Sequence, residues 1–212
     1  MFINYLLDFL FPPRCIGCNN NDYLLCENCR EKLVFSPYKT DYINNLDCTY
    51  ISCKSSPLLK TIIHRFKYSY KEELGNILGD LLSNTLKVHN ISENYILVPI
   101  PLHISRKFWR GFNQAELLAK MISKKRSIPV KNLLKRNKKT HSQAKLKRID
   151  RINNLKNAFF LRSSFSKIDL INKKIILVDD IATTGATFES AAQALRNEGF
   201  KEIYGLAICR GL

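Results

Sequence analysis

Ile-Ile-Leu-Val-Asp-Asp-Ile-Ala-Thr-Thr-Gly-Ala-Thr, residues 175–187, is the stretch of the chain that predicts its fold. Four apolar residues in a row, 175–178, are typical of a parallel strand buried on both faces, where alternation of apolar and polar positions disappears. Asp179 and Asp180 follow at the carboxyl end of this strand, the edge of an open α/β sheet where ligands bind. Residues 183–187 then lead into an amphipathic helix, whose free N–H groups and dipole favour an anion. The stretch therefore predicts a site for a phosphorylated sugar.

The same stretch closely resembles the phosphoribosyl pyrophosphate (PRPP) motif of type I phosphoribosyltransferases: a hydrophobic strand, two acidic residues and a Thr-Thr-Gly loop. Two other interpretations are a strand that ends by chance in two solvated aspartates, and a Walker B acidic pair. The Walker interpretation is weak, because the P-loop pattern Gly-x-x-x-x-Gly-Lys-Ser/Thr occurs nowhere in the chain.

The composition is that of a globular protein with one full core and a small appendage. The chain has 212 residues, of which 45% are hydrophobic. No apolar run reaches the roughly 18 to 20 residues that a membrane span requires. Residues 1–11 lack the basic start and the cleavage site of a signal peptide, so we expect a short amphipathic helix there. We therefore expect a cytoplasmic protein without membrane insertion.

The positive charge is concentrated in one part of the chain. Residues 1–100 hold ten Lys/Arg and ten Asp/Glu, residues 101–160 hold 17 and two, and residues 161–212 hold seven and six. Nearly all of the net charge of +16 thus lies in the middle segment. A basic block beside a phosphate motif indicates a polyanionic partner, which is pyrophosphate, nucleic acid or both.

The chain divides into an N-terminal module, residues 1–56, and an α/β domain, residues 57–212. In the second part expected helices alternate with expected strands, which is typical of a parallel sheet flanked by helices. These elements cover residues 57–82, 95–98, 113–125, 158–161, 175–178, 187–197 and 202–208. Residues of about 132–154 are polar without a sustained period and predict a mobile basic loop or a hairpin.

Two C-x-x-C pairs in the N-terminal module predict a zinc site. Cys15 and Cys18 form the first pair and Cys26 and Cys29 the second, with seven residues between the pairs. Four thiolates at this spacing can close a tetrahedral site. A pair of disulfides is the main alternative, but no secretion signal accompanies the cysteines, and a reducing cytoplasm keeps thiols free. A redox motif is a weaker alternative, because the usual βαβ context is missing.

Residues 103–114, His-Ile-Ser-Arg-Lys-Phe-Trp-Arg-Gly-Phe-Asn-Gln, make the resemblance specific. Arg-Gly-Phe-Asn-Gln opens a helix after a strand ending Val-Pro-Ile-Pro-Leu, and both precede the acidic motif. Together with the cysteine pairs and the segment 66–68, they resemble the ComF (ComFC, GntX-like) family of phosphoribosyltransferase-related proteins over nearly the whole chain. Many ComF relatives carry two further C-x-x-C pairs where this chain has only Cys48 and Cys53, so a second metal site stays an open question.

The resemblance implies a type I phosphoribosyltransferase fold and a role for each element of the site. Asp179 and Asp180 would hold the ribose hydroxyls, directly or through the Mg²⁺ that PRPP carries. The loop before the helix, with Pro101 and His103, would face the pyrophosphate. The 5-phosphate would be cradled by the motif loop, which comprises Thr183, Thr184, Gly185, Ala186 and Thr187.

Arg106 and Arg110 complete the candidate catalytic set beside the two aspartates. Cations fixed near the departing pyrophosphate lower the barrier to breaking its bond with the sugar, and arginine binds phosphate in a bidentate manner. Each single arginine of the block also has a second interpretation, as a solvated surface charge. The aromatic residues among them, Phe108, Trp109 and Phe112, are candidates either for stacking on bases or for packing in the core.

Two functions follow from these patterns. The first is a ComF-type PRPP-binding protein that supports DNA uptake in natural transformation, with single-stranded DNA and the competence machinery as partners. The second is an active phosphoribosyltransferase on a nucleobase-like acceptor in nucleotide metabolism or salvage. The acceptor hood would come from the cysteine module and residues 34–56, and a flexible lid from about 136–148. The nucleic-acid candidates are Lys135, Arg136, Lys138, Lys139 and Arg148.

Overall fold

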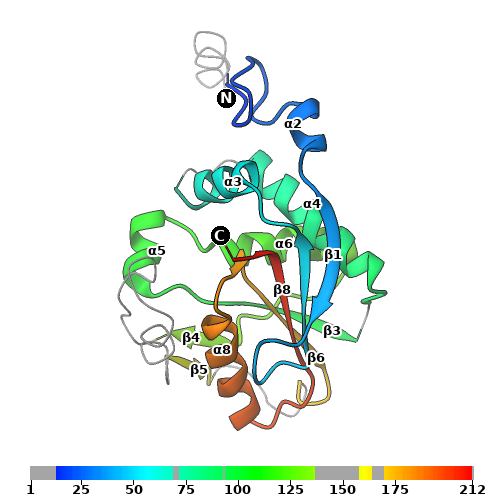
Figure 1. Cartoon of the computed structure of the whole chain (residues 1–212). Helices are drawn as coiled ribbons and strands as arrows, with labels where there is room; N and C mark the ends of the chain where they lie inside the picture. The colour runs from blue at the N-terminus through cyan, green and yellow to red at the C-terminus, as the bar shows by residue number, and fades with distance from the viewer. Residues whose placement is uncertain (1–12, 69–71, 93, 137–157, 164–169, 212) are drawn as a thin grey trace.

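The computed structural model describes residues 13–68, 72–92, 94–136, 158–163 and 170–211 (Figure 1). The expected N-terminal helix, most of the basic loop, and Lys138, Lys139 and Arg148 lie outside the described residues. In the described part of the chain, no helix has both the length and the apolar character to cross a membrane.

The elements follow the expected order, with short additions. The helices are α2 (Glu27–Glu31), α3 (Pro57–Tyr68), α4 (Glu72–Val88), α5 (Ile104–Arg110), α6 (Gln114–Arg126) and α8 (Ala186–Asn197). The strands are β1 (Phe35–Thr40), β2 (Cys48–Cys53), β3 (Tyr95–Pro99), β4 (Leu134–Arg136), β5 (Phe159–Leu161), β6 (Lys174–Val178), β7 (Ile181–Ala182) and β8 (Ile203–Arg210). The apolar period of 57–82 thus belongs to two helices, α3 and α4, and the sequence did not predict α5.

The central sheet confirms the expected α/β fold. Its strand order is β1-β2-β8-β6-β3, with β7 paired to β8 beyond the end of β6. The pairs β2–β8, β8–β6 and β6–β3 are parallel, and β1 closes the edge as an antiparallel strand. The hairpin β1–β2, which lies within the predicted N-terminal module, therefore hydrogen bonds into the main sheet. The strands β4 and β5 form a separate antiparallel pair, so residues 158–161 do not join the parallel sheet as the sequence predicts.

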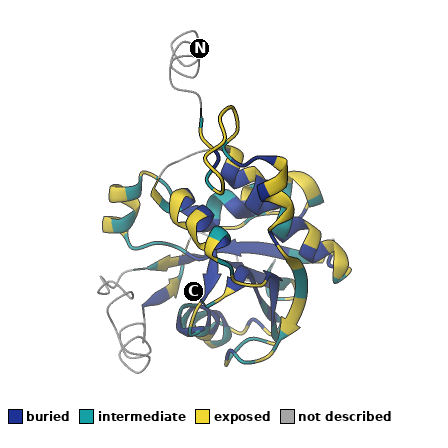
Figure 2. Ribbon diagram, turned by 45° about the horizontal axis from the view of Figure 1, so that its top comes forward, coloured by how far each residue is buried: buried dark blue, intermediate teal, exposed yellow. Residues whose placement is uncertain are grey.

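The motif strand β6 is buried on both faces because side chains alternate across a strand. Ile176 and Val178 join the core beneath α3, α4 and α6, while Ile175 and Leu177 join the core beneath α8. All four side chains are completely shielded from solvent. Figure 2 shows the buried sheet between these two helical layers. This arrangement explains why the strand reads as a continuous apolar run.

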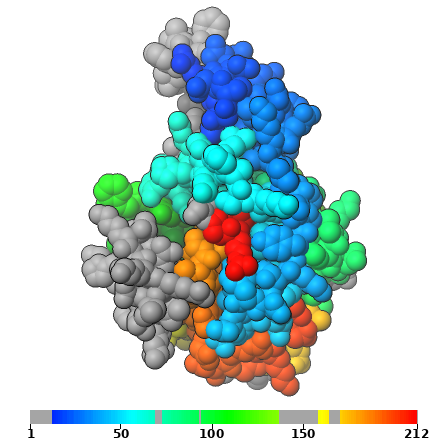
Figure 3. Space-filling view, in the orientation of Figure 1, coloured from blue at the N-terminus to red at the C-terminus, as the bar shows by residue number. Residues whose placement is uncertain are grey.

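The cysteine module packs on α3 and α4 (Figures 1 and 3). Cys15, Cys26 and Cys29 belong to the same buried cluster as the apolar faces of these helices. At the module's rim, Arg30 lies 3.6 Å from the Asp80 carboxylate of α4. The module is thus continuous with the core on this side of the sheet.

The helices α4 and α6 approach each other closely at Gly79. A Cβ atom there would lie 2.7 Å from the Cβ of Met121, closer than real Cβ contacts come. Gly75, one turn earlier on α4, has more room, because a Cβ atom there would lie 3.4 Å from the Phe66 ring. A glycine is therefore required at only one of these two positions.

We predict opposite effects of alanine at the two positions. Gly79→Ala should lower the free energy of unfolding by about 1–3 kcal/mol, because it forces α4 away from α6. Gly75→Ala, the matched control, should be neutral or raise it by up to ~1 kcal/mol, because alanine favours a helix over glycine. Urea denaturation measures both, and equal effects would contradict the close contact.

Candidate functional site

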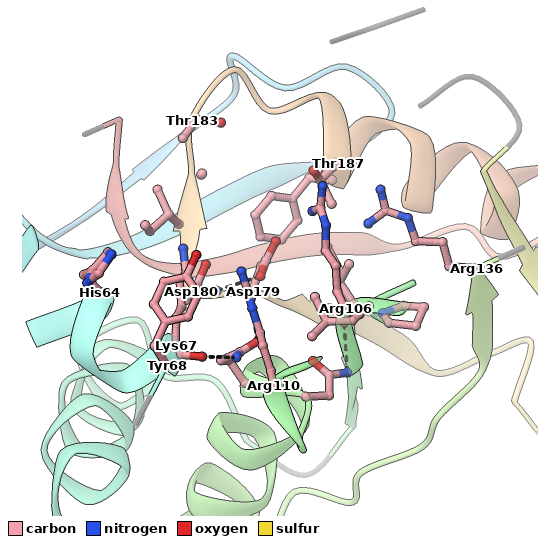
Figure 4. A pocket seen from close by; sticks show the side chains of 18 of the residues that line it. His64, Lys67, Tyr68, Arg106, Arg110, Arg136, Asp179, Asp180, Thr183 and Thr187 are labelled. Atoms are coloured by element: carbon pink, nitrogen blue, oxygen red, sulfur yellow. Dashed lines mark hydrogen bonds and ion pairs between the residues drawn. The ribbon is translucent and has the colours of Figure 1, made fainter. Parts of the chain in front are cut away.

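A cavity of about 910 Å³ opens at the carboxyl ends of β3 and β6. Its lining comes from the end of α3, the loop between β3 and α5, the end of α5, the start of α6, β4, and the segment from β6 to α8 (Figure 4). All of these elements belong to the α/β domain. The described residues 13–56, where the acceptor hood was expected, do not line this cavity.

The two aspartates stand at the end of β6, where the parallel ladder holds their backbone. The Asp179 N–H donates to the Leu206 carbonyl at 3.1 Å, and the Asp180 carbonyl accepts from Ile208 at 3.1 Å. The Asp179 carboxylate in turn accepts the Asp180 N–H at 2.9 Å. Both carboxylates face the cavity, as the sequence predicts.

The Thr-Thr-Gly loop forms the start of α8 and is braced from outside. Gly185 adopts a left-handed conformation with φ 81°. A Cβ atom there would also lie 2.7 Å from the buried side chain of Ile43, in the β1–β2 loop. In the same loop, the Tyr42 hydroxyl donates to the Ala182 carbonyl at 3.1 Å. Thr183, Gly185 and Thr187 line the cavity. This brace could not be predicted from sequence patterns, because Ile43 lies far from the motif along the chain.

Lys67, in the last turn of α3, reaches the acidic pair. Its Nζ lies 3.0 Å from Oδ2 of Asp180, and both side chains are mostly buried. The sequence showed Lys67 only within the segment 66–68 of the family resemblance. No sequence pattern connects Lys67 with Asp180, because the two residues lie far apart along the chain. The ion pair offsets part of the negative charge at the sheet edge.

Arg106 and Arg136 approach each other in the cavity from different elements. Arg136 ends β4, and its pKa falls to about 10 because the guanidinium is buried and lies near the Arg106 cation. The pKa of Arg106 is lowered by burial and by the neighbouring Arg110 cation. These clustered cations prefer an anionic ligand. Arg136, predicted as a nucleic-acid contact, thus lies in the cavity instead of on the outer surface (Figure 4).

Arg110 lies on the α3 side of the cavity (Figure 4). Its Nη1 donates to Oε1 of Gln114 at 3.1 Å, and its guanidinium stands 5.3 Å from the centre of the Tyr68 ring. Gln114 is buried, and its Nε2 donates to the Lys67 carbonyl at 3.2 Å. One amide therefore holds both Arg110 and the end of α3, which gives the Arg-Gly-Phe-Asn-Gln stretch a structural role.

The loop between β3 and α5 carries the other predicted residues. Pro101 lines the cavity. His103 caps α5, because its Nδ1 accepts the Ser105 N–H at 3.2 Å. The Asn113 side chain caps α6 and donates to the Ile100 carbonyl at 3.1 Å, which fixes the loop. His64, which was not among the predicted site residues, also lines the cavity.

The short helix α5 buries none of its residues. Phe108 and Trp109 are each 89% exposed, and Ile104 is 76% exposed. Of the two interpretations offered for Phe108 and Trp109, core packing is therefore excluded. These apolar side chains alternate with Arg106, Lys107 and Arg110 along the helix.

The four cysteines of the N-terminal module meet as predicted. Their sulfur atoms all lie within 4.8 Å of one another, which suits a tetrahedral structural zinc site. Burial alone would raise the pKa of the Cys15 thiol, but the N–H groups of Cys26 and Gly17 donate to its sulfur, and the pKa falls to about 6. In the described part of the chain, Cys48 and Cys53 join no metal-ligating cluster.

Two domain families match this chain. The Phosphoribosyl transferase domain matches residues 98–211, and the Double zinc ribbon domain matches residues 6–40. The first match runs from the end of β3 to the end of β8. It includes the residues that line the cavity except those on α3. The second covers the cysteine cluster and agrees with structural zinc.

Relatives with similar sequences include two competence proteins and a DNA utilization protein. Competence protein F of Haemophilus influenzae is 32% identical over 93% of this chain and 97% of its own length. Competence protein ComFC of Bacillus subtilis is 34% identical over 67% of this chain and 55% of its own length. DNA utilization protein YhgH of Escherichia coli K12 is 30% identical over 74% of this chain and 69% of its own length.

The Asp179 carboxyl provides a pH test of the site. Burial and the neighbouring Asp180 carboxylate raise its pKa to about 7. In the unfolded chain this carboxyl loses its proton at a pH of about 4, whereas the folded protein keeps the proton up to about pH 7. The free energy of unfolding should therefore fall as pH rises from about 4 to 7.

In buffer without Mg²⁺ or PRPP, we predict that Asp179→Asn raises Tm at pH 8 and that the gain shrinks towards pH 5. Asparagine cannot ionise, so it removes the energetic cost of the buried charge. The exposed residue Asp41 offers a control, because Asp41→Asn should change Tm equally at both pH values. Calorimetry at both pH values measures the difference, and a gain independent of pH would contradict the raised pKa.

Proposed function

Because the chain belongs to the ComF family of phosphoribosyltransferase-related proteins, we propose that it binds PRPP with Mg²⁺ in this cavity and supports DNA uptake. The observation that carries the proposal is the meeting of Asp179 and Asp180, the loop 183–187, Arg106 and Arg136 around one cavity. PRPP needs each of these groups, because it joins a ribose diol to a phosphate and a pyrophosphate.

Each part of PRPP has a complementary part of the cavity. The 5-phosphate would lie at the start of α8, where the loop 183–187 offers N–H and hydroxyl donors. The ribose hydroxyls would meet Asp179 and Asp180. The pyrophosphate would lie towards Arg106 and Arg136, whose mutual repulsion an anion relieves. The lining near Pro101 would close this end.

The carboxylates of Asp179 and Asp180 fit Mg²⁺, a hard cation that binds one or two carboxylates together with substrate phosphates. Bound Mg²⁺ would neutralise charge on the pyrophosphate as it departs. Lys67 already supplies one positive charge to Asp180. It would therefore orient this carboxylate before PRPP arrives.

We propose a role in DNA uptake from the names of the relatives and from the surface of the molecule. Two relatives are named for competence and one for DNA utilization. The exposed rings of Phe108 and Trp109 among cations suit a single strand, whose bases stack on aromatics while its phosphates meet Lys and Arg. We propose single-stranded DNA and the competence machinery as partners, in the cytoplasm, where the zinc thiolates stay reduced.

Active phosphoribosyl transfer is a second candidate. One observation favours it: the cavity continues past the groups assigned to PRPP to a wall formed by His64, Tyr68 and Trp109. A protein that only bound PRPP would need no such wall. The acceptor would be a nucleobase-like ring in nucleotide metabolism or salvage.

We predict that PRPP with Mg²⁺ raises Tm and that Asp180→Asn abolishes the rise. At a ligand concentration about 100-fold above Kd, the gain of ~2.7 kcal/mol corresponds to roughly 5–10 °C for a chain of this length. Asp80→Asn, a change in α4 outside the cavity, should keep the full shift. Thermal melting with and without ligand measures it, and an unchanged shift in Asp180→Asn would place the ligand elsewhere.

We also predict salt-sensitive binding of single-stranded DNA, with two separable contributions. Neutralising Lys135, Lys138 and Lys139 should flatten the slope of log K against log salt, because each phosphate contact contributes about −0.7. Trp109→Ala should weaken binding by roughly ten- to a hundredfold without changing the slope, because stacking does not release counterions.

Fluorescence anisotropy with oligo-dT at several salt concentrations measures both quantities. Neutralising Lys173 and Lys201, which precede β6 and β8 at the opposite edge of the sheet, is the matched control and should leave the slope unchanged. An affinity that changes neither with salt concentration nor with substitution of the basic block or Trp109 would refute binding on this surface.

A further inference from the structure

One wall of the cavity adds side chains beyond those assigned to PRPP. It is built from the last turn of α3, which carries His64, Lys67 and Tyr68, and from the end of α5, which carries Trp109 and Arg110. We infer that this wall is a second subsite, for a planar ring that carries an anionic substituent and accepts the phosphoribosyl group. The inference rests on the proposed function, because the ring would lie beside bound PRPP.

The wall is held together by a buried amide. Gln114 is 2% exposed, accepts from Arg110 at 3.1 Å and donates to the Lys67 carbonyl at 3.2 Å. These two bonds join α3 to α5, which are far apart in sequence. A glutamine in this role fixes an arginine and a helix end relative to each other before any ligand binds, which is how a preorganised subsite is built.

The wall offers aromatic surface for a flat ligand. Tyr68 is 60% exposed at the end of α3, and its ring centre lies 4.8 Å from that of His64. The Arg110 guanidinium stands over the same ring at 5.3 Å. Trp109, which is 89% exposed, lines the cavity from α5. A planar ring can pack against the aromatic rings of this wall with little loss of side-chain freedom, since aromatic side chains have few rotatable bonds.

The charges of the wall select for an anion. Among the described residues that line the cavity, Asp179 and Asp180 are the only carboxylates, and Asp180 is already paired with Lys67. Gln114 orients the Arg110 guanidinium through a hydrogen bond. A neutral ring would give this guanidinium no charged partner. Sites built for a charged partner reject uncharged analogues for this reason. The substituent that fits is a carboxylate or a phosphate.

A second hollow, of about 350 Å³, extends the same wall along α3. It is lined by Lys60, Thr61 and Ile63 and shares His64 and Lys67 with the main cavity. Its lysines are cationic, so it could take a phosphate attached to the ring. The ligand thus has two chemical sources, a free ring carboxylate or a nucleotide.

The position of Lys67 places the subsite next to the ribose. Its Nζ contacts Asp180, which would hold the ribose, while its backbone carbonyl contacts Gln114 of the wall. A ring nitrogen in this subsite would donate its lone pair to the anomeric carbon as the bond from that carbon to the pyrophosphate oxygen breaks. The electron pair leaves with the pyrophosphate, and a proton on the attacking nitrogen passes to water.

Matched pairs of ligands test this inference. Nicotinate against nicotinamide and a nucleoside 5′-monophosphate against its nucleoside are titrated by calorimetry, with and without PRPP and Mg²⁺, while pyrophosphate release is followed. We expect the anionic member of a pair to bind at least about tenfold more tightly. The pair with the larger ratio identifies the source, a free carboxylate or a nucleotide.

Two variants separate the ring from the charge. Arg110→Gln should reduce the ratio between anionic and neutral members to about twofold or less, because it removes the cation. Tyr68→Leu should weaken both members by roughly tenfold and keep their ratio, while its PRPP titration stays unchanged. Lys107→Gln, an exposed change on α5 outside the cavity, is the control and should match the wild type.

Neutral rings that bind as tightly as anionic ones, an unchanged ratio in Arg110→Gln, or no binding of any ring would each overturn the inference. The titration without PRPP tests the subsite independently of the donor. A wild-type protein that fails to bind PRPP would instead overturn the proposed function.

Discussion

The burial of β6 on both faces is the constraint from which the rest of the structure follows. A strand that is apolar on both sides must be covered by helices on both sides, which fixes α8 on one face and α3, α4 and α6 on the other. Polar side chains can follow only where the strand leaves this core, and Asp179 and Asp180 stand at that point. Two adjacent carboxylates at the rim of an apolar core repel each other and need cations. Lys67 and the arginines of the middle segment meet this need, so the position of one strand determines where the positive charge gathers.

The cysteine module is tied to this site through α3. A segment this short buries too little apolar surface to fold unaided, so it needs both zinc and the domain beneath it. Cys15 and Cys29 pack in the same core as Leu59 and Phe66 of α3, and the last turn of α3 carries Lys67 into the cavity. The helix therefore lies between the zinc site and the acidic pair. A module that touches no part of the cavity still determines how one wall of it is placed.

What could be predicted from the sequence was the information that lies along the chain. Three features could be predicted because each is a local pattern: the apolar run of β6, the aspartates after it and the spacing of the four cysteines. The missed features depend on contacts between distant segments. Nothing near Ile43 indicates that it braces Gly185, and nothing near Lys67 indicates a partner in Asp180. The hairpin β1–β2 was placed in the module because β8, the strand that pairs with β2 in the main sheet, lies at the other end of the chain. Arg136 looked like one charge in a basic block, because the sequence alone cannot show which member of such a block turns inward.

The concentrated charge of residues 101–160 therefore has an inner and an outer part. Arg106 and Arg136 lie close together in the cavity, where burial lowers the pKa of Arg136 to about 10, whereas the exposed side chains of Lys107 and Phe108 on α5 lie outside it. Like charges held together in a partly buried cavity destabilise the site before a ligand binds, since desolvation and repulsion both oppose them. An anion removes this penalty when it binds, and a neutral ligand cannot. The cavity is thus biased towards highly charged ligands before any specific hydrogen bond forms, and the hydrogen bonds of the loop 183–187 and of Gln114 then decide among such ligands.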